Sequence, residues 1–142
     1  MKYRFFKVGL FAALGVLFLQ ACQKTSTPST PYTQLEGNWK LTQTATDDND
    51  NGILDRNELV NVSNDVEFLK FNKDLTGTQT ITINDTTNTY AFTWNLANND
   101  SELIRIEDGD SIVSQIDNIN STDLTLRQNT TPVISWELYS KQ

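Results

Sequence analysis

Histidine is absent from this chain of 142 residues, and cysteine occurs once. Without histidine, an imidazole triad, a histidine-ligated zinc site and imidazole acid–base catalysis are all excluded. Basic residues are also scarce, because 11 lysines and arginines stand against 18 acidic residues, which gives a formal net charge of −7. Such a surface repels nucleic acid and anionic lipid headgroups, so no nucleic-acid partner is expected.

Features that support catalysis are scarce as well. The sequence has no glycine-rich phosphate loop. Four acids, Glu102, Glu107, Asp108 and Asp110, lie near one predicted hairpin, where solvated turn charges are favoured over the facing carboxylates of a glycosidase. We therefore expect no enzyme activity, with a carboxylate-based hydrolase as the remote alternative.

A basic start and a short apolar run open the chain. Lys2, Arg4 and Lys7 precede an apolar run over residues 8–19, which is too short to cross a bilayer of ~30 Å as a helix. This order predicts a secretion signal over residues 1–21. Removal of the signal leaves 8 basic against 18 acidic residues and a net charge of −10.

Directly after this run, residues 19–22 read Leu-Gln-Ala-Cys and resemble the lipobox of bacterial lipoproteins. The resemblance implies that Cys22 is acylated, becomes the first mature residue and anchors an outer-membrane lipoprotein on the periplasmic or cell-surface face. A thiol without a disulfide partner in an exported chain fits this role. An uncleaved helical anchor, or a signal peptide with an incidental cysteine, is the alternative. Residues 22–34, rich in Ser, Thr and Pro, predict an extended, mobile tether.

Residues 35–142 predict one all-β domain. Short β-branched and aromatic runs, separated by Asn, Asp and Gly, recur at roughly ten-residue intervals. The sharpest period-two pattern is Tyr90, Phe92, Trp94 and Leu96, with its aromatic face inward. About eight runs predict a small antiparallel up-and-down β-barrel, because closure removes exposed sheet edges. These runs are residues 37–45, 66–71, 78–83, 90–96, 104–106, 112–116, 124–127 and 134–138.

Between the first two predicted strands, residues 47–58 match a calcium loop. Calcium takes six to eight oxygen ligands, and a twelve-residue loop supplies them from positions 1, 3, 5, 7, 9 and 12, with glycine at position 6. The residues at these ligand positions are Asp47, Asn49, Asn51, Ile53 through its backbone carbonyl, Asp55 and Glu58, and Gly52 holds position 6.

The segment before this loop reads as a strand, so the helix pair of an EF-hand is not expected. We expect instead a structural calcium clamp, followed by at most a short helical turn over residues 55–60. A dissociation constant of about 10⁻⁴ to 10⁻³ M is typical of extracellular modules. A solvated acidic hairpin with a tight turn at Asn51 and Gly52 is the alternative reading.

Three stretches of the predicted barrel carry a second resemblance. Residues 35–41 contain Gly37 and Trp39, residues 68–78 are a strand followed by Asp74 and Gly77-Thr78, and residues 136–139 read Trp-Glu-Leu-Tyr. In this order they resemble the Gly-x-Trp opening strand, the strand and Gly-Thr turn, and the closing strand of small lipocalin-like lipoproteins of Bacteroidetes-type bacteria. In lipocalins an arginine near the barrel end packs over this tryptophan. The last predicted strand here has no arginine, and Arg127 is the nearby candidate.

Five aromatic residues have two interpretations: Trp39, Phe92, Trp94, Trp136 and Tyr139. They either fill the barrel or, as the lipocalin resemblance implies, Trp39, Phe92, Trp94 and Trp136 line a cavity for a small apolar ligand. The sequence favours a lipid-anchored, calcium-stabilised, non-catalytic binding or accessory module, with an apolar ligand or an envelope protein as partner. A purely structural envelope protein with a filled barrel is the alternative.

Overall fold

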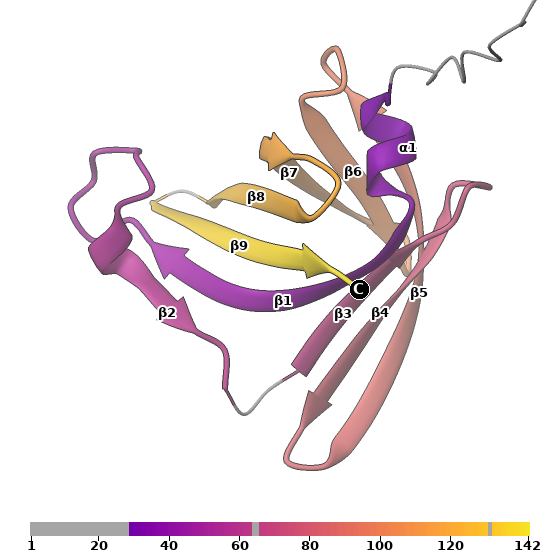
Figure 1. The fold of residues 1–142 in the computed structure, drawn as a ribbon, viewed down its shortest axis with the longest axis horizontal. Helices are drawn as coiled ribbons and strands as arrows, with labels where there is room; N and C mark the ends of the chain where they lie inside the picture. Colours follow the sequence, from indigo (N-terminus) through magenta and orange to yellow (C-terminus); the bar gives the residue numbers. More distant parts are fainter. Residues whose placement is uncertain (1–28, 64–65, 131) are drawn as a thin grey trace, which may run out of the picture.

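A computed structural model describes residues 29–63, 66–130 and 132–142, so the predicted signal peptide and Cys22 lie outside the described residues. Figure 1 shows a strongly curved sheet with a short helix beside it. The elements are α1 (Pro31–Leu35), β1 (Gly37–Thr46), η1 (Arg56–Glu58), β2 (Leu59–Asn61), β3 (Val66–Phe71), β4 (Thr76–Ile83), β5 (Thr86–Ala97), β6 (Glu102–Glu107), β7 (Asp110–Ile119), β8 (Asp123–Thr130) and β9 (Val133–Lys141). Across these described ranges, no helix has the length and apolar character needed to traverse a bilayer.

Every strand pairs antiparallel with its neighbours, in the order β2-β1-β3-β4-β5-β6-β7-β8-β9. The sheet closes because β1 also pairs with β9, from Trp39 opposite Lys141 to Thr46 opposite Ser135. β1 and β3 to β9 thus form a closed eight-stranded barrel, and the short β2 lies beside β1. The prediction of an all-β, antiparallel barrel is confirmed.

β1 changes partner part-way along its length. Its first residues, Gly37 to Lys40, pair with β3, and the later residues Gln43 to Ala45 pair with β2. Between them the pairing with β9 shifts register at Leu41 and Gln43, which indicates a bulge that bends the strand. β2 therefore covers the stretch of β1 edge that β3 leaves unpaired.

The barrel core is built from the inward faces that the alternation predicts for β5. Phe92, Trp94 and Leu96 are buried, whereas Tyr90 at the start of the same face is 41% exposed. The ring of Phe71 meets Phe92 and Trp94 edge-on, with centroid distances of 5.5 and 5.4 Å. The core cluster comprises Leu35, Trp39, Leu41, Leu69, Phe71, Phe92, Trp94, Leu96, Leu103, Leu124, Leu126 and Tyr139.

Helix α1 corrects the predicted tether. Residues 31–34 are helical rather than extended, because Pro31 stands in the first turn and the Thr30 hydroxyl accepts a hydrogen bond from the Thr33 amide. Leu35 at the end of α1 is fully buried, and the Tyr32 hydroxyl donates to Asn95 Oδ1 at 2.6 Å. The composition of residues 22–34 predicts mobility, but Tyr32 in this stretch packs against the core beside Leu35, the first residue of the predicted domain.

A lysine, not Arg127, packs over Trp39. Lys141 Nζ lies 4.9 Å from the centre of the Trp39 ring and donates a hydrogen bond to the carbonyl of Gln34 at 2.7 Å. Burial lowers the pKa of Lys141, and the nearby Glu36 carboxylate partly opposes that shift. Arg127 instead pairs with Asp117 at 3.2 Å. The last strand therefore supplies the cation, although as lysine rather than arginine.

Candidate functional site

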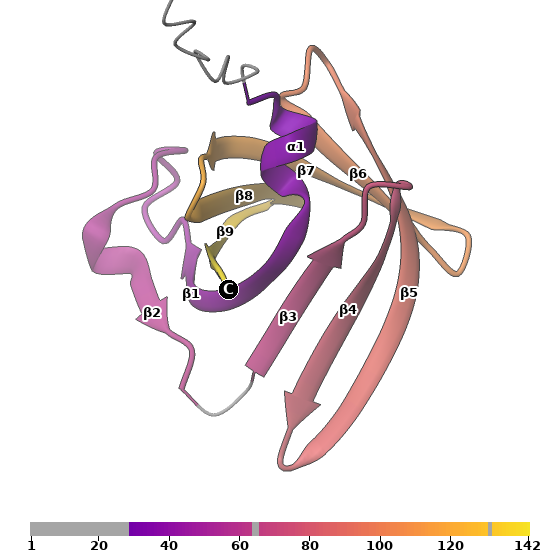
Figure 2. The same cartoon turned by 45° about the vertical axis from the view of Figure 1, so that its right-hand side comes forward.

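The two ends of the barrel differ in their covering and in their side chains. Because the strands alternate in direction, α1 shares one end with the β3–β4, β5–β6 and β7–β8 turns, which we call the α1 end. The β1–β2 loop and the β4–β5, β6–β7 and β8–β9 turns lie at the opposite, open end. Figure 2 shows α1 at one end of the barrel and the β4–β5 turn at the other.

The rings considered as ligand contacts are packed into the protein. Trp39, Phe92, Trp94 and Trp136 are all buried. The indole nitrogens donate to protein oxygens: Trp39 to the Leu35 carbonyl at 2.7 Å, Trp94 to the Thr76 carbonyl at 3.0 Å, and Trp136 to Asp117 Oδ2 at 2.9 Å. The three tryptophans therefore have no indole N–H left for a ligand.

Trp136 also differs from the other rings in its position. It lies outside the core cluster, whereas Tyr139 on the same strand belongs to it. Residues three apart on a strand face opposite sides, so Trp136 is on the outer face of β9. Its register partners there are Arg127 on β8 and Ala45 on β1.

Polar side chains meet in the interior below the aromatic core. We call Glu67, Arg105, Ser114, Glu137 and Tyr139 the interior polar cluster. The Tyr139 hydroxyl lies 2.9 Å from Glu67 Oε1 and 3.1 Å from Glu137 Oε2, so it links strands β3 and β9. Gln79 Nε2 donates to the same Glu67 oxygen at 3.0 Å. The barrel interior is therefore apolar at the α1 end and polar toward the open end.

Arg105 is the buried cation of this cluster. It is 3% exposed, and its guanidinium carbon lies 5.7 Å from the centre of the Phe92 ring. Arg105 Nε and Nη1, together with the hydroxyl of Ser114, have no hydrogen-bond partner among the described residues. Buried polar groups are usually paired, so three unpaired atoms in one interior mark this region as unusual.

The pKa values of two members follow from the same arrangement. Burial raises the pKa of the Glu137 carboxyl, the negative charge of Glu67 raises it further, and Arg105 acts in the opposite direction. Burial also raises the pKa of the Tyr139 hydroxyl well above its usual value, with the charges of Glu137 and Glu67 adding to the effect. The site therefore favours a protonated phenol between two carboxyl groups.

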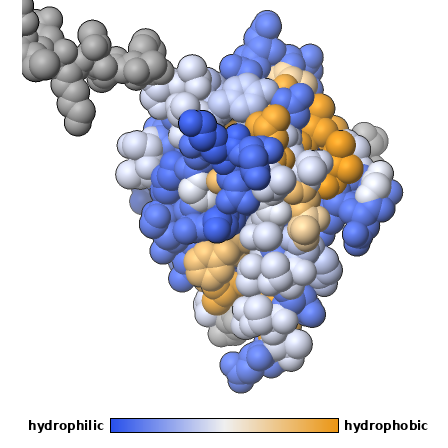
Figure 3. All heavy atoms as spheres, turned by 90° about the vertical axis from the view of Figure 1, so that its right-hand side faces the viewer, coloured by the Kyte–Doolittle hydropathy of each residue, from blue (hydrophilic) through white to orange (hydrophobic). Residues whose placement is uncertain are grey.

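The sequence patterns missed this cluster because they followed the apolar residues. On β6 the inward residues are Leu103 and Arg105, which are buried, whereas Ile106 is exposed. The outward faces of the same strands carry apolar residues, among them Ile106 on β6 and Val113 on β7, which are exposed. Figure 3 shows that apolar residues form patches between hydrophilic ones on one side of the molecule. The available signal was the β6 alternation itself, in which Arg105 and Leu103 share a face.

The acidic loop between β1 and β2 is ordered around its first and last acids. Asp47 and Glu58 are only 7% and 5% exposed. Asp47 accepts hydrogen bonds from the amides of Asn51 and Gly52 at 3.1 and 2.7 Å. Glu58 accepts from the amides of Asp48 and Asp55 through its two oxygens, at 3.2 and 3.1 Å. Both carboxylates thus fold the loop back on itself.

Three of the four remaining candidate ligands, Asn49, Asn51 and Asp55, meet inside this loop, whereas the side chain of Ile53 is exposed. The side-chain amides of Asn49 and Asn51 each donate to Asp55 Oδ2 at 3.0 Å. Gly52, with φ of +70°, occupies the left-handed turn that the motif requires at its sixth position. In the described part of the chain, no three histidine, cysteine or acidic side chains are grouped as metal ligands. The donor set is rich in the oxygen atoms that suit calcium, and calcium binding by these residues stays a prediction.

Comparison with known proteins fits this geometry. The family model described as lipocalin-like domain matches residues 35–126. The chain belongs to this family. Among solved structures, a lipocalin-like protein from Bacteroides uniformis is 13% identical, with a TM-score of 0.55 over 77% of this chain and 99% of that chain. The bovine lipocalin allergen Bos d 2 is 10% identical, with a TM-score of 0.47 over 78% of this chain and 75% of that chain. No curated protein matches significantly.

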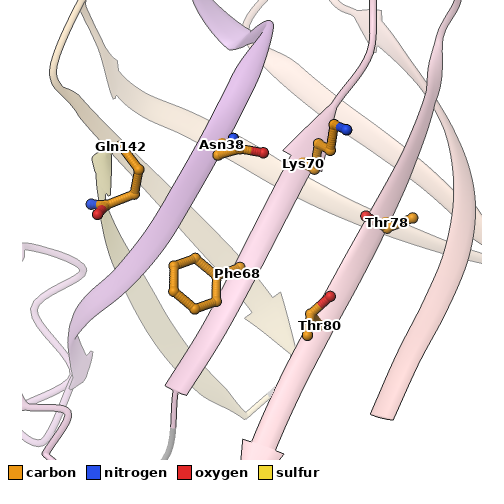
Figure 4. Close-up of a pocket in the computed structure, with 6 residues that line it drawn as sticks. All are labelled: Asn38, Phe68, Lys70, Thr78, Thr80 and Gln142. Carbon is orange, nitrogen blue, oxygen red and sulfur yellow. The ribbon is translucent and has the colours of Figure 1, made fainter. Parts of the chain in front are cut away.

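The outer wall of the lipocalin-like barrel carries a separate groove of about 310 Å³. Its lining residues come from β1, β3 and β4 and from the C-terminus, and they are Asn38, Phe68, Lys70, Thr78, Thr80 and Gln142 (Figure 4). The strand register sets Lys70 opposite both Asn38 and Thr78 on the outer face. Lys70 is the one charged side chain among these lining residues.

Proposed function

We propose that this chain is a lipid-anchored envelope protein whose lipocalin-like barrel is a non-catalytic binding or accessory module for a small molecule or an envelope protein. One observation carries the proposal: a barrel of the lipocalin-like family turns unpaired polar atoms of Arg105 and Ser114 into its interior. Members of this fold bind molecules inside the barrel, and unpaired interior atoms are suited to a bound partner.

The predicted lipid anchor is part of this proposal. The leader before Cys22 and the lipobox-like residues 19–22 support it. Growth of expressing cells with labelled palmitate tests the anchor, with Cys22→Ala as the variant. We expect label on the wild-type protein only. Equal labelling of Cys22→Ala would remove the anchor from the proposal.

The proposal also includes calcium as a clamp on the β1–β2 loop. The six ligand positions match, and the buried carboxylates of Asp47 and Glu58 already bend the loop around its centre. At a calcium concentration about tenfold above the dissociation constant, binding would add about 1.4 kcal/mol to the free energy of unfolding. An extracellular site of this affinity stays filled where calcium is steady, which suits a structural role.

Thermal unfolding with millimolar calcium or with chelator tests the clamp. We expect calcium to raise the melting temperature of the wild type and of Asp85→Asn, an acid in the β4–β5 turn outside the loop. Asp47→Asn and Glu58→Gln should lose that increase, because each removes a charged ligand. If calcium leaves the wild-type melting temperature unchanged, the loop is a solvated acidic hairpin and the clamp is wrong.

A structural protein with a filled barrel is the second candidate. It is favoured by the buried rings of Trp39, Phe92 and Trp94, which pack the α1 end. In that case, neither apolar nor polar small molecules would enter the interior. The binding experiment described below separates this candidate from a binding module.

A further inference from the structure

We propose that the interior polar cluster binds a small, uncharged, hydroxyl-rich molecule such as a simple sugar or a cyclic polyol. The inference rests on the proposed binding function and names the chemistry of its ligand. It is built on Arg105 and Ser114, whose polar atoms lack partners among the described residues, and on Glu67 and Glu137 across the interior.

The donor side of the site consists of Arg105 and Ser114. Ser114 is 1% exposed and lies on β7, where its neighbour on the same face, Ile112, is in register with Arg105. This diagonal placement brings the Ser114 hydroxyl and the guanidinium to the same part of the interior. Both offer hydrogens that no oxygen of the described residues accepts. A ligand oxygen between them would satisfy that need.

The acceptor side consists of the two carboxyl groups. Glu67 and Glu137 share the single hydroxyl of Tyr139, which can donate to only one of them at a time. Gln79 also donates to Glu67, and Gln128 bonds to Glu137. Because a carboxylate has about four acceptor sites, both groups keep capacity for another donor. The positive charge of Arg105 acts to lower the pKa of Glu137 and of Tyr139, against the larger effect of burial. No ion pair within the 29–63, 66–130 and 132–142 ranges joins it to either carboxylate.

These surroundings discriminate against other classes of ligand. An anion on Arg105 would lie close to two glutamates, and a cation on the glutamates would lie close to the guanidinium. An apolar molecule would leave the donors of Arg105 and Ser114 buried without acceptors. A hydroxyl group both donates and accepts, so several hydroxyls on one neutral molecule satisfy both sides of the site.

At the open end, a cavity lies beside the strand pair that carries Arg105. This cavity, of about 330 Å³, is lined by Tyr90, Glu107, Asp108, Asp110 and Ile112. Tyr90 and Ile112 are on the inward faces of β5 and β7, and Ile112 is the register partner of Arg105. The exposed ring of Tyr90 gives this cavity an apolar face, against which the C–H groups of a sugar ring can pack.

Solution NMR of the full chain in detergent micelles provides the test. The probes are glucose, galactose, mannose, N-acetylglucosamine and myo-inositol, each titrated to about 50 mM, with the Arg105 Nε–H resonance as the readout. We expect at least one probe to shift this resonance saturably. Ser114→Ala should weaken that binding by about three- to tenfold, the usual effect of one hydrogen bond. Ser111→Ala, on the same strand but exposed, is the matched control and should bind as the wild type does.

Two further titrations separate this inference from the proposed function. Sodium octanoate and 1-octanol test a charged and a neutral apolar ligand at the same resonance. If octanoate or octanol binds and none of the hydroxyl-rich probes does, the barrel is a binding module but its ligand is not hydroxyl-rich, and the inference is overturned. If no probe shifts the Arg105 resonance saturably, the interior is closed to ligands, and both the inference and the small-molecule arm of the proposed function fail. Equal affinities of Ser114→Ala and Ser111→Ala would also contradict the assigned site.

Discussion

Replacement of Gly77 by alanine should destabilise the barrel strongly, because the ring of Phe92 occupies the place of a side chain there. Gly77 is buried on β4, directly opposite Phe92 on β5. A Cβ atom at position 77 would overlap two ring atoms of Phe92 and would lie 2.5 Å from the carbonyl oxygen of Lys70. The Lys70 oxygen is backbone in the neighbouring strand, so it cannot rotate away.

The Phe92 ring has little room to move either. It packs edge-on against Phe71 at 5.5 Å, and the guanidinium of Arg105 lies 5.7 Å from its centre on the polar side. Overpacking of a tight core costs about 1 to 3 kcal/mol. Because both neighbours of the new methyl group are fixed, we expect a value near 3 kcal/mol, which is a large fraction of the 5 to 15 kcal/mol typical of a domain.

Urea unfolding followed by tryptophan fluorescence measures this loss as a lower midpoint at unchanged slope. A double-mutant cycle with Phe92→Leu isolates the clash with the ring. Gly77→Ala should cost less in the Phe92→Leu background than in the wild type, with a coupling of about 0.5 to 3 kcal/mol. A loss below about 0.5 kcal/mol for Gly77→Ala, or strict additivity in the cycle, would refute the packing described for β4 and β5.

Three other predictions concern α1, the lysine over Trp39 and the interior acids. Leu35→Ala should lower the free energy of unfolding by about 2 to 5 kcal/mol, because a fully buried side chain is lost. Urea unfolding measures this loss, and a loss as small as that of a surface substitution would contradict the packing of α1 onto the barrel. Lys141→Met should cost about 0.5 to 2 kcal/mol, with Lys141→Arg close to wild type, if the cation over Trp39 is stabilising. Glu137→Gln should gain stability relative to wild type between pH 4 and pH 8, because the raised pKa of Glu137 makes ionisation in the folded state unfavourable as pH rises. A constant difference across that range would contradict the burial of Glu137.

The strand pattern could be predicted because alternation and turn chemistry are local properties. Phe92, Trp94 and Leu96 alternate with exposed residues on β5, and their inward face was correctly inferred. Closure followed from the number of strands and the cost of open edges, although no single residue encodes it. The β1–β9 pairing that closes the barrel joins Trp39 to Lys141, at opposite ends of the domain sequence.

The polar interior and α1 could not be predicted by the same reasoning. A sequence pattern that collects apolar residues assigns charge to the outside, yet Arg105 is buried beside Phe92. The burial of Arg105 depends on tertiary contacts between strands that lie far apart in the sequence. The same holds for residues 31–34, whose composition suggests a tether, although Tyr32 packs against the core and its hydroxyl donates to Asn95. Conversely, Trp136 is a large ring on an alternating strand, and only the register with Arg127 and Ala45 places it outside the core cluster.

The position of the acidic loop gives the proposed calcium clamp a mechanical role in this barrel. β1 leaves β3 after Lys40, and the loop follows the stretch where β2 takes over the exposed edge. The loop is tied to the barrel on both sides: the Asp47 amide donates to the Ile134 carbonyl of β9 at 2.9 Å, and the Val62 amide donates to the Thr42 carbonyl of β1 at 3.0 Å. A cation held between Asp47 and Glu58 would fix these attachments relative to each other. It would thereby stabilise β2 on β1, where the pairing comprises three residue pairs, without contacting the interior polar cluster. Calcium should accordingly raise the unfolding temperature while leaving the affinity for an interior ligand unchanged, and a calcium-dependent affinity would show that the loop regulates the open end instead.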